Sequence, residues 1–268
     1  MSASLTVRGL TAGYGGKPII HGVDLEVPAG GALTIVGPNG SGKSTLLKAI
    51  VGLVGALEGS IHLDDTPITG LPAPARTRLG LAYVPQEANV FRNMSVHENL
   101  RLGWEAQHAR RSGFTRKATQ NQQQRTQLAD KLDETLALFP EIKPHTNTLA
   151  GLLSGGQRQM VAVAAAMMLE PGLLVLDEPS AGLSPKNAGL LFEIIRRIRD
   201  VGLTLLMIEQ NVQLGLTVAD RGLVLVMGRV RRVAPAAQLA ADGTLAELFL
   251  GVDRLHSPEQ ATELAVLS

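Results

Sequence analysis

The sequence predicts an α/β domain built around a phosphate-binding loop, with an antiparallel β part and an inserted helical subdomain. Three observations lead to this fold class. A glycine-rich segment stands between an apolar run of strand length and a helix-like segment, further continuous apolar runs follow, and the composition becomes polar and helical between about residues 95 and 155. We expect the domain to occupy residues 1–251, and residues 252–268 to form a tail with little to bury.

Composition narrows the classes of function. The 268 residues are 45% hydrophobic and carry a net charge of +1, which supports a real core and argues against a nucleic-acid partner. The absence of cysteine excludes disulfides, zinc–thiolate sites and thiol catalysis. We expect no signal peptide, and the longest apolar run, Met160–Leu169, is roughly half of what crosses a bilayer. If the protein works at a membrane, another chain must cross it.

The glycine-rich segment fits the phosphate-loop pattern G-x-x-x-x-G-K-[ST]. Its residues are Gly37, Pro38, Asn39, Gly40, Ser41, Gly42, Lys43, Ser44 and Thr45. The strand-like run 32–36 precedes it and an apolar helix follows, so the alternative of an ordinary glycine-rich turn is disfavoured. Backbone N–H groups would wrap the phosphates, Lys43 would reach the β- and γ-phosphates, and the Ser44 hydroxyl would bind Mg²⁺.

The N-terminal segment contains two expected strands. Leu5–Val7 forms the first, and Val23–Val27 alternates apolar and acidic residues as a half-buried strand does. Between them, residues 11–16 are expected to form a loop that carries Tyr14. Its ring would either pack at a hairpin tip or stack on a nucleobase, and the residues alone favour packing.

After the loop helix, residues 59–65 indicate a short strand and turn, and Leu79–Pro85 indicates a buried strand. Gln86 follows at the carboxyl end of that strand, where ligands bind in open α/β sheets. Its amide could bind Mg²⁺ or hold a water molecule, or it could be a solvated loop amide.

The inserted block begins with a helix capped by Ser95, which stands at capping-box spacing from Glu98. The Arg- and Gln-rich stretch 109–126 could bind nucleic acid or lipid headgroups, but a solvated helix or connection is favoured. A further helix ends at Pro140. Ser154, Gly155, Gly156 and Gln157 then open a helix, and the amides at its start offer a second anion site or an ordinary cap.

A continuous apolar strand, Leu173–Leu176, ends in Asp177 and Glu178. Downstream of a phosphate loop, these acids fit a magnesium-binding Asp and a water-polarising Glu, although paired acids can also be merely solvated. A helix over 190–198 and another buried strand over 203–208 follow, and the strand closes with Glu209 and Gln210. A last strand pair lies over 223–227 and 230–233.

The sequence resembles the ABC-type ATPases, which are P-loop NTPases. The resemblance lies in the order and spacing of four features: the phosphate loop, Gln86, Leu153–Gln157 and Leu173–Glu178. The resemblance covers about residues 3 to 251. It implies that ATP and Mg²⁺ are the cofactors and that Tyr14 stacks on adenine. It also implies catalytic roles for Glu178, Gln210 and Gln86, and magnesium binding by Ser44, Gln86 and Asp177.

The resemblance also implies the assembly. Two such domains would face head to tail, so Ser154, Gly155, Gly156 and Gln157 would bind the nucleotide of a second ABC ATPase subunit. Membrane-spanning permease subunits would be the partners, with an extracytoplasmic solute-binding protein acting indirectly and no nucleic acid. The chain would then be peripheral, on the cytoplasmic face of the inner membrane.

Two departures narrow the subfamily. Residues 179–185 replace the common Ser-Ala-Leu-Asp segment, and Gln210 stands where most of the family has His. Both features, and residues 91–100, resemble the shorter ATPase subunit of branched-chain amino acid importers. The open alternatives are a urea or amide importer, an exporter or lipid-extraction system, and a soluble ABC ATPase acting on nucleic acid or ribosomes. The solute, the choice between homodimer and heterodimer, and the roles of 109–126 and the tail stay open.

Overall fold

A six-stranded sheet forms the centre of the computed structural model, which describes residues 2–87, 89–108, 118–243 and 245. Its strand order is β10-β9-β3-β8-β7-β6, and the neighbours from β9 to β6 pair in parallel while β10 is antiparallel to β9. The strands are β3 (Ala32–Val36), β6 (Leu81–Val84), β7 (Leu173–Asp177), β8 (Thr204–Ile208), β9 (Arg221–Val226) and β10 (Arg229–Pro235). Every residue of β3, β7 and β8 is buried, which explains why these strands are continuous apolar runs in the sequence.

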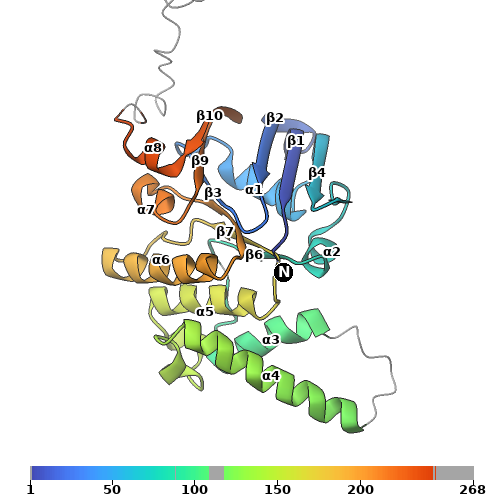
Figure 1. Cartoon of the computed structure of the whole chain (residues 1–268), viewed down its shortest axis with the longest axis vertical. Helices are drawn as coiled ribbons and strands as arrows, with labels where there is room; N and C mark the ends of the chain where they lie inside the picture. The colour runs from blue at the N-terminus through green and yellow to red at the C-terminus, as the bar shows by residue number, and fades with distance from the viewer. Residues whose placement is uncertain (1, 88, 109–117, 244, 246–268) are drawn as a thin grey trace, which may run out of the picture.

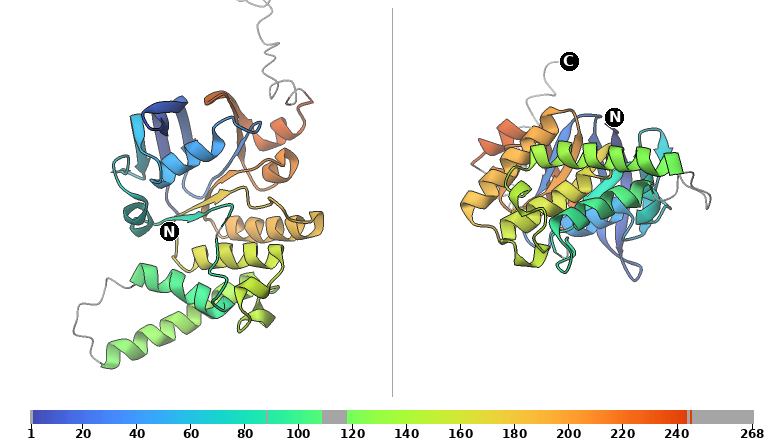
Figure 2. Two further views of the ribbon diagram at one scale, coloured as in Figure 1. Left: turned by 180° about the vertical axis from the view of Figure 1, so that it is seen from behind. Right: turned by 90° about the horizontal axis from the view of Figure 1, so that it is seen from below.

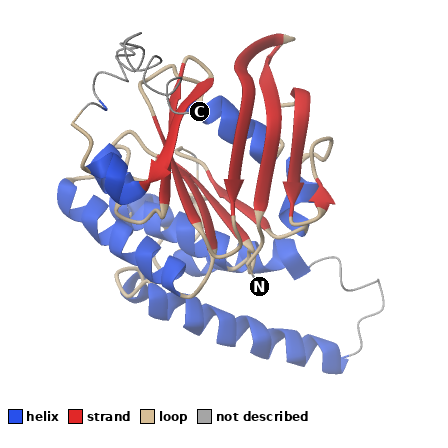
Figure 3. Cartoon of the chain, turned by 45° about the horizontal axis from the view of Figure 1, so that its top comes forward, coloured by secondary structure: helices blue, strands red, loops and turns tan. Residues whose placement is uncertain are grey.

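A second, antiparallel sheet has the order β2-β1-β4-β5. It consists of β1 (Leu5–Tyr14), β2 (Lys17–Val27), β4 (Ala56–Leu63) and β5 (Thr66–Pro67). Helix α1 (Lys43–Val51) lies between the two sheets, and its apolar residues join theirs in one core (Figures 1 and 3). The expected antiparallel part is therefore present.

Strands β1 and β2 extend well beyond the two short strands that the sequence predicted, and Tyr14 ends β1 instead of lying in a loop. The register between them shifts after Val7, and Gly9 and Gly22 have φ values of 56° and 58°. These positive angles suit glycine, and the resulting bulges interrupt the alternating pattern on which the prediction relied.

Besides α1, the helices of the described residues are α2 (Ala73–Arg78), α3 (Val96–His108), α4 (Ala118–Leu138), α5 (Gly155–Met167), α6 (Pro185–Asp200), α7 (Val212–Leu216) and α8 (Ala236–Ala240), with short 3₁₀ turns η1 (Lys143–His145) and η2 (Ala150–Leu152). The longer ones, α3 to α6, form layers below the central sheet in the view of Figure 1. Figures 1 and 2 show α3 and α4 on the side away from the antiparallel sheet, with α5 and α6 between them and the central sheet. This arrangement fits the expected helical subdomain, although the domain boundaries stay a prediction.

The capping box predicted at Ser95 is present. The Ser95 hydroxyl accepts from the Glu98 amide, and the Glu98 carboxylate accepts from the Ser95 amide in return. Part of the Arg- and Gln-rich stretch 109–126 lies outside the described residues, and the part from Ala118 onward is the beginning of α4. The predicted tail, 252–268, lies wholly outside them.

Arg76 completes the carboxyl end of α1. Its side chain is 2% exposed, and its guanidinium donates to the carbonyl oxygens of Ala49 (2.8 Å) and Ile50 (2.5 Å) in the last turn. The same group also donates to the carbonyls of Leu71 and Thr69. Because the carbonyls at a helix end lack partners within the helix, a buried cation there is favourable. Arg76 thus fixes the far end of the helix that begins at the phosphate loop.

Arg76→Met should destabilise the protein by about 3 kcal/mol, because it leaves several buried carbonyl oxygens without a donor. Urea unfolding measures this change. Arg78→Met is the matched control, since Arg78 is exposed and donates only to Pro74. Equal unfolding midpoints for the two variants would contradict the role given to Arg76.

Candidate functional site

The phosphate loop connects β3 to α1. Gly42 stands just before α1 with φ at 99°, a conformation that a side chain would strain. Lys43 is buried at the first position of the helix, and its Nζ donates to the carbonyl oxygens of Gly37 (2.8 Å) and Pro38 (3.1 Å). The ammonium group therefore lies inside the curve of the loop, where a phosphate bound by the loop amides would meet it.

A pocket of about 410 Å³ opens over this loop. Its lining residues are Ile19, Asn39, Gly40, Ser41, Gly42, Lys43, Ser44, Thr45, Gln86, Glu178 and Gln210. The fold therefore brings together phosphate-loop residues, Gln86, Glu178 and Gln210, which the sequence had placed at the ends of separate strands. Tyr14 is not among the residues that line this pocket. It lies at the end of β1 and is 49% exposed.

Asp177 ends β7 and Glu178 follows it, so the two acids lie at the end of the buried strand as the sequence predicted. Both carboxylates are buried, and Tyr83 Oη donates to Asp177 Oδ2 at 3.0 Å. Burial raises the pKa of Asp177, and the hydrogen bond from Tyr83 counteracts part of that shift. Within the described part of the chain, Asp177 Oδ1 and the buried Ser41 Oγ have no hydrogen-bond partner. A buried oxygen atom without a hydrogen-bond partner is suited to bind a ligand that supplies a positive charge or a hydrogen-bond donor.

Glu178 is oriented by an unusual backbone and by Gln210. Its φ is 47°, in the left-handed region, and its amide donates to Ile208 O at 3.0 Å. Gln210 Nε2 donates to Glu178 Oε2 at 2.6 Å. The carboxylates of Glu178 and Asp177 raise the pKa of Lys43, although its burial lowers that pKa by more. Lys43, Asp177 and Glu178 therefore form one interacting group of charges.

Residues 154–157 lie apart from this pocket. The Ser154 hydroxyl accepts from the Gln157 amide, and the Gln157 side chain accepts from the Ser154 amide in return, so the capping box at the start of α5 is complete. Ser154 and Gly155 are exposed. Gly156 packs on α6 so closely that a Cβ there would lie 2.9 Å from Cβ of Asn187. The start of α5 is therefore exposed at Ser154 and Gly155, outside the pocket over the chain's own phosphate loop.

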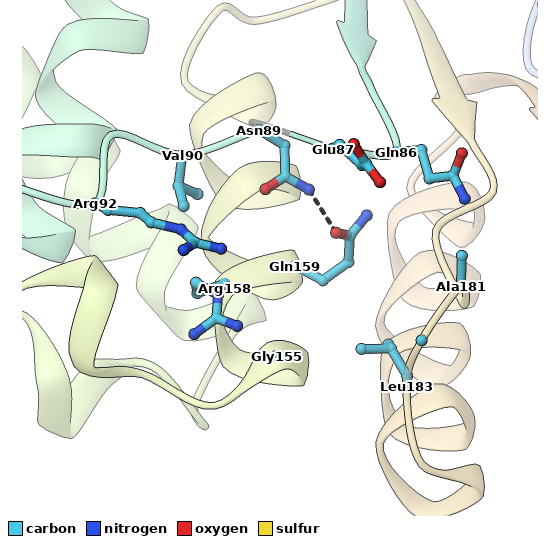
Figure 4. A pocket seen from close by; sticks show the side chains of 11 residues that line it. Gln86, Glu87, Asn89, Val90, Arg92, Gly155, Arg158, Gln159, Ala181 and Leu183 are labelled. Atoms are coloured by element: carbon cyan, nitrogen blue, oxygen red, sulfur yellow. Dashed lines mark hydrogen bonds between the residues drawn. The ribbon is translucent and has the colours of Figure 1, made fainter.

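Gly155 borders a second pocket, of about 640 Å³, which shares only Gln86 with the first (Figure 4). Across it, Asn89 Nδ2 donates to Gln159 Oε1 at 2.5 Å. This bond joins the segment after Gln86 to α5. Gln159 is buried, and its Nε2 has no partner among the described residues.

Sequence reasoning missed Tyr83, whose hydroxyl binds Asp177. The available signal was a residue with a polar tip in an otherwise apolar strand, three positions before Gln86. Parallel pairing sets Tyr83 opposite Val175, two residues before Asp177, and this non-local register was not readable from the sequence.

A model of the ABC transporter family matches residues 20–181. The chain belongs to the ABC transporter family. This ABC chain is 40% identical to the probable branched-chain amino acid transport ATP-binding protein LivF of Archaeoglobus fulgidus, over 91% of this chain and 97% of that protein. It is 37% identical to the high-affinity branched-chain amino acid transport ATP-binding protein BraG of Pseudomonas aeruginosa, over 89% of this chain and 95% of BraG.

The lipopolysaccharide export system ATP-binding protein LptB of Escherichia coli is 32% identical, over 94% of this ABC chain and 98% of LptB. Among solved structures, the ADP conformation of MJ1267, an ATP-binding cassette of an ABC transporter, superposes with a TM-score of 0.77 at 25% identity. That match covers 94% of this chain and all of MJ1267.

Membership in this family makes the chain a nucleotide-binding protein and a transport ATPase, as the sequence predicted. In the parts of the chain that the structure describes, no helix is both long and apolar enough to cross a membrane. The individual roles assigned to the site residues stay predictions.

Lys43→Ala should strongly weaken nucleotide binding and reduce ATP hydrolysis by about 10²- to 10³-fold, because it removes a cation from the phosphate pocket. Binding of a fluorescent ATP analogue and release of phosphate measure the two effects. Lys143→Ala, which changes an exposed lysine in η1, is the control. Hydrolysis by Lys43→Ala at the parent rate would remove the phosphate loop from the mechanism.

Proposed function

We propose that the chain is the ATP-hydrolysing subunit that energises an ABC importer for branched-chain amino acids. The observation that carries the catalytic part is the pocket in which phosphate-loop residues, Gln86, Glu178 and Gln210 meet. The solute class follows from the similarity to LivF and BraG, which extends over about nine tenths of the chain.

ATP would bind with its phosphates in the loop. The amides at the start of α1 and the Lys43 ammonium would neutralise the β- and γ-phosphates. Ser44, Asp177 and Gln86 would hold Mg²⁺, and the free Oδ1 of buried Asp177 fits a metal ligand. When bound, Mg²⁺ supplies charge neutralisation at the phosphate oxygens. Tyr14 would stack on the adenine from the end of β1, outside the residues that line the phosphate pocket.

Glu178 would act as the general base. Its carboxylate accepts a proton from the water that attacks the γ-phosphorus, and ADP leaves with the bridging oxygen. Gln210 holds that carboxylate through the 2.6 Å hydrogen bond, and its amide can also orient the γ-phosphate. Glutamine cannot become a cation as histidine can, so Gln210 would position groups without adding charge.

A second ATPase subunit would complete each site. Ser154 and Gly155 are exposed and do not line the pocket over the chain's own phosphate loop, so this helix start is accessible to a nucleotide held by a partner. Permease subunits would provide the membrane passage and hold the chain at the cytoplasmic face of the inner membrane. An extracytoplasmic solute-binding protein would deliver the solute to them. The similarity to LptB favours one alternative, an ATPase of a lipid-exporting system.

Glu178→Gln should bind Mg-ATP normally and hydrolyse it very slowly, because the amide keeps the shape of the side chain but cannot take a proton. A dimer should then accumulate in Mg-ATP, visible by size-exclusion chromatography, while the same sample in Mg-ADP stays monomeric. Persistent hydrolysis would place the base elsewhere.

A strain that lacks the gene should lose uptake of radiolabelled leucine, isoleucine and valine. The parent gene should restore uptake, and the gene carrying Glu178→Gln should not, since transport requires hydrolysis. Normal uptake of all three amino acids would overturn the proposed solute class. Accompanying loss of urea uptake would support an amide importer, and a lipid-export defect would support the LptB-like alternative.

A further inference from the structure

Glu209 is a buried acid for which the mechanism above has no use. It follows β8 directly, is 1% exposed, and its amide donates to Ile35 O. Its carboxylate binds Ser180 twice: the Ser180 amide donates to Oε1 at 2.9 Å, and the Ser180 hydroxyl donates to Oε2 at 2.9 Å. Glu209 therefore joins the end of β8 to the turn that follows Glu178.

The same carboxylate also holds the segment that follows it. Oε2 accepts from the amides of Gln210 (3.1 Å) and Asn211 (3.3 Å). Asn211 in turn caps α7 by accepting from the Leu214 amide at 3.0 Å. Three of the four donors are backbone N–H groups, which can only donate, so the side chain must accept at both oxygens. A carboxylate meets this demand, and an amide cannot.

Packing fixes the stem of the Glu209 side chain. A Cβ at Gly215 of α7 would lie 2.9 Å from Cβ of Glu209 and 3.0 Å from Cγ2 of Thr34, so the helix backbone lies directly against both residues. Burial raises the pKa of Glu209, and hydrogen bonds from Ser180 and Asn211 counteract part of the shift. Because a buried carboxylate is costly unless it is well bonded, its presence at this position indicates a geometric role.

We propose that Glu209 is a positioning residue for hydrolysis, which fixes the turn after Glu178 against Gln210 and so sets the Gln210–Glu178 hydrogen bond. The inference rests on the proposed function, since it concerns the same site. Ser180 stands two residues after the general base, and Gln210 stands directly after Glu209. One carboxylate thus bonds to both segments that must meet for Gln210 to orient Glu178.

The test is single-turnover hydrolysis of Mg-ATP by the full chain assembled with its partner subunits, with the complex in excess over ATP. Glu209→Gln keeps the size of the side chain but gives it one acceptor oxygen and an amide that faces donors. It should slow hydrolysis by about 10- to 100-fold and change the ATP dissociation constant by less than about threefold. Glu193→Gln, the same change at an exposed position of α6, should hydrolyse at the parent rate.

A double-mutant cycle separates positioning from a general structural effect. If Glu209 acts through Gln210, Glu209→Gln should slow hydrolysis little further in a chain that already carries Gln210→Ala. If the double variant hydrolyses ATP more slowly than the parent by the product of the two single-variant factors, the proposal is overturned, because Glu209 would then act independently of Gln210. Parent-rate hydrolysis by folded Glu209→Gln would overturn it as well.

Ser180→Ala covers the case in which Glu209→Gln does not fold. It removes only the hydroxyl donor, so it should slow hydrolysis by a few-fold, again without adding to Gln210→Ala, while Ser180→Thr should restore the rate. Parent-rate hydrolysis by Ser180→Ala, or a loss that multiplies with Gln210→Ala, would overturn the proposal. The proposed function fails separately, if the parent chain assembled with its partner subunits does not hydrolyse ATP or if Lys43→Ala in the same assembly hydrolyses it equally well.

Discussion

Ile208 pairs with Ile35 on one side and with Asp177 on the other, so the parallel strands β3, β8 and β7 end at the same level of the sheet. The phosphate loop, the Glu209–Gln210 segment and the two acids leave from these three ends. A slip of one residue in either pairing would turn each side chain to the opposite face of the sheet. The strands are buried throughout and largely apolar, so they resist such a slip, because it would break the packing on both faces at once.

The same edge concentrates charge in a place with little water. Lys43, Asp177, Glu178 and Glu209 are all buried, and the three acids offset part of the cost of burying the ammonium group. Each acid is also tied to a different neighbour: Tyr83 binds Asp177, Gln210 binds Glu178, and Ser180 binds Glu209. These bonds hold the three acids within the protein, and charges held in place reduce the reorganisation that a reaction requires.

What the sequence could predict was mostly local. The phosphate loop, the Ser95 capping box and the acids at the end of a buried strand all depend on residues close together in the chain, and the structure contains them. The full lengths of β1 and β2 escaped prediction because glycine bulges break the alternation. Tyr83, the bonds of Arg76 to α1 and the Glu209–Ser180 bonds escaped it because their partners are 26 to 94 residues away, and only the tertiary fold joins them.

The contact of Gly156 with Asn187 has a mechanical meaning. With the backbone of α5 pressed against a side chain of α6, the two helices cannot roll or slide past one another at that point without overlap. The absence of a side chain at Gly156 thus ties the start of α5 directly to the first turn of α6, which begins a few residues after Ser180.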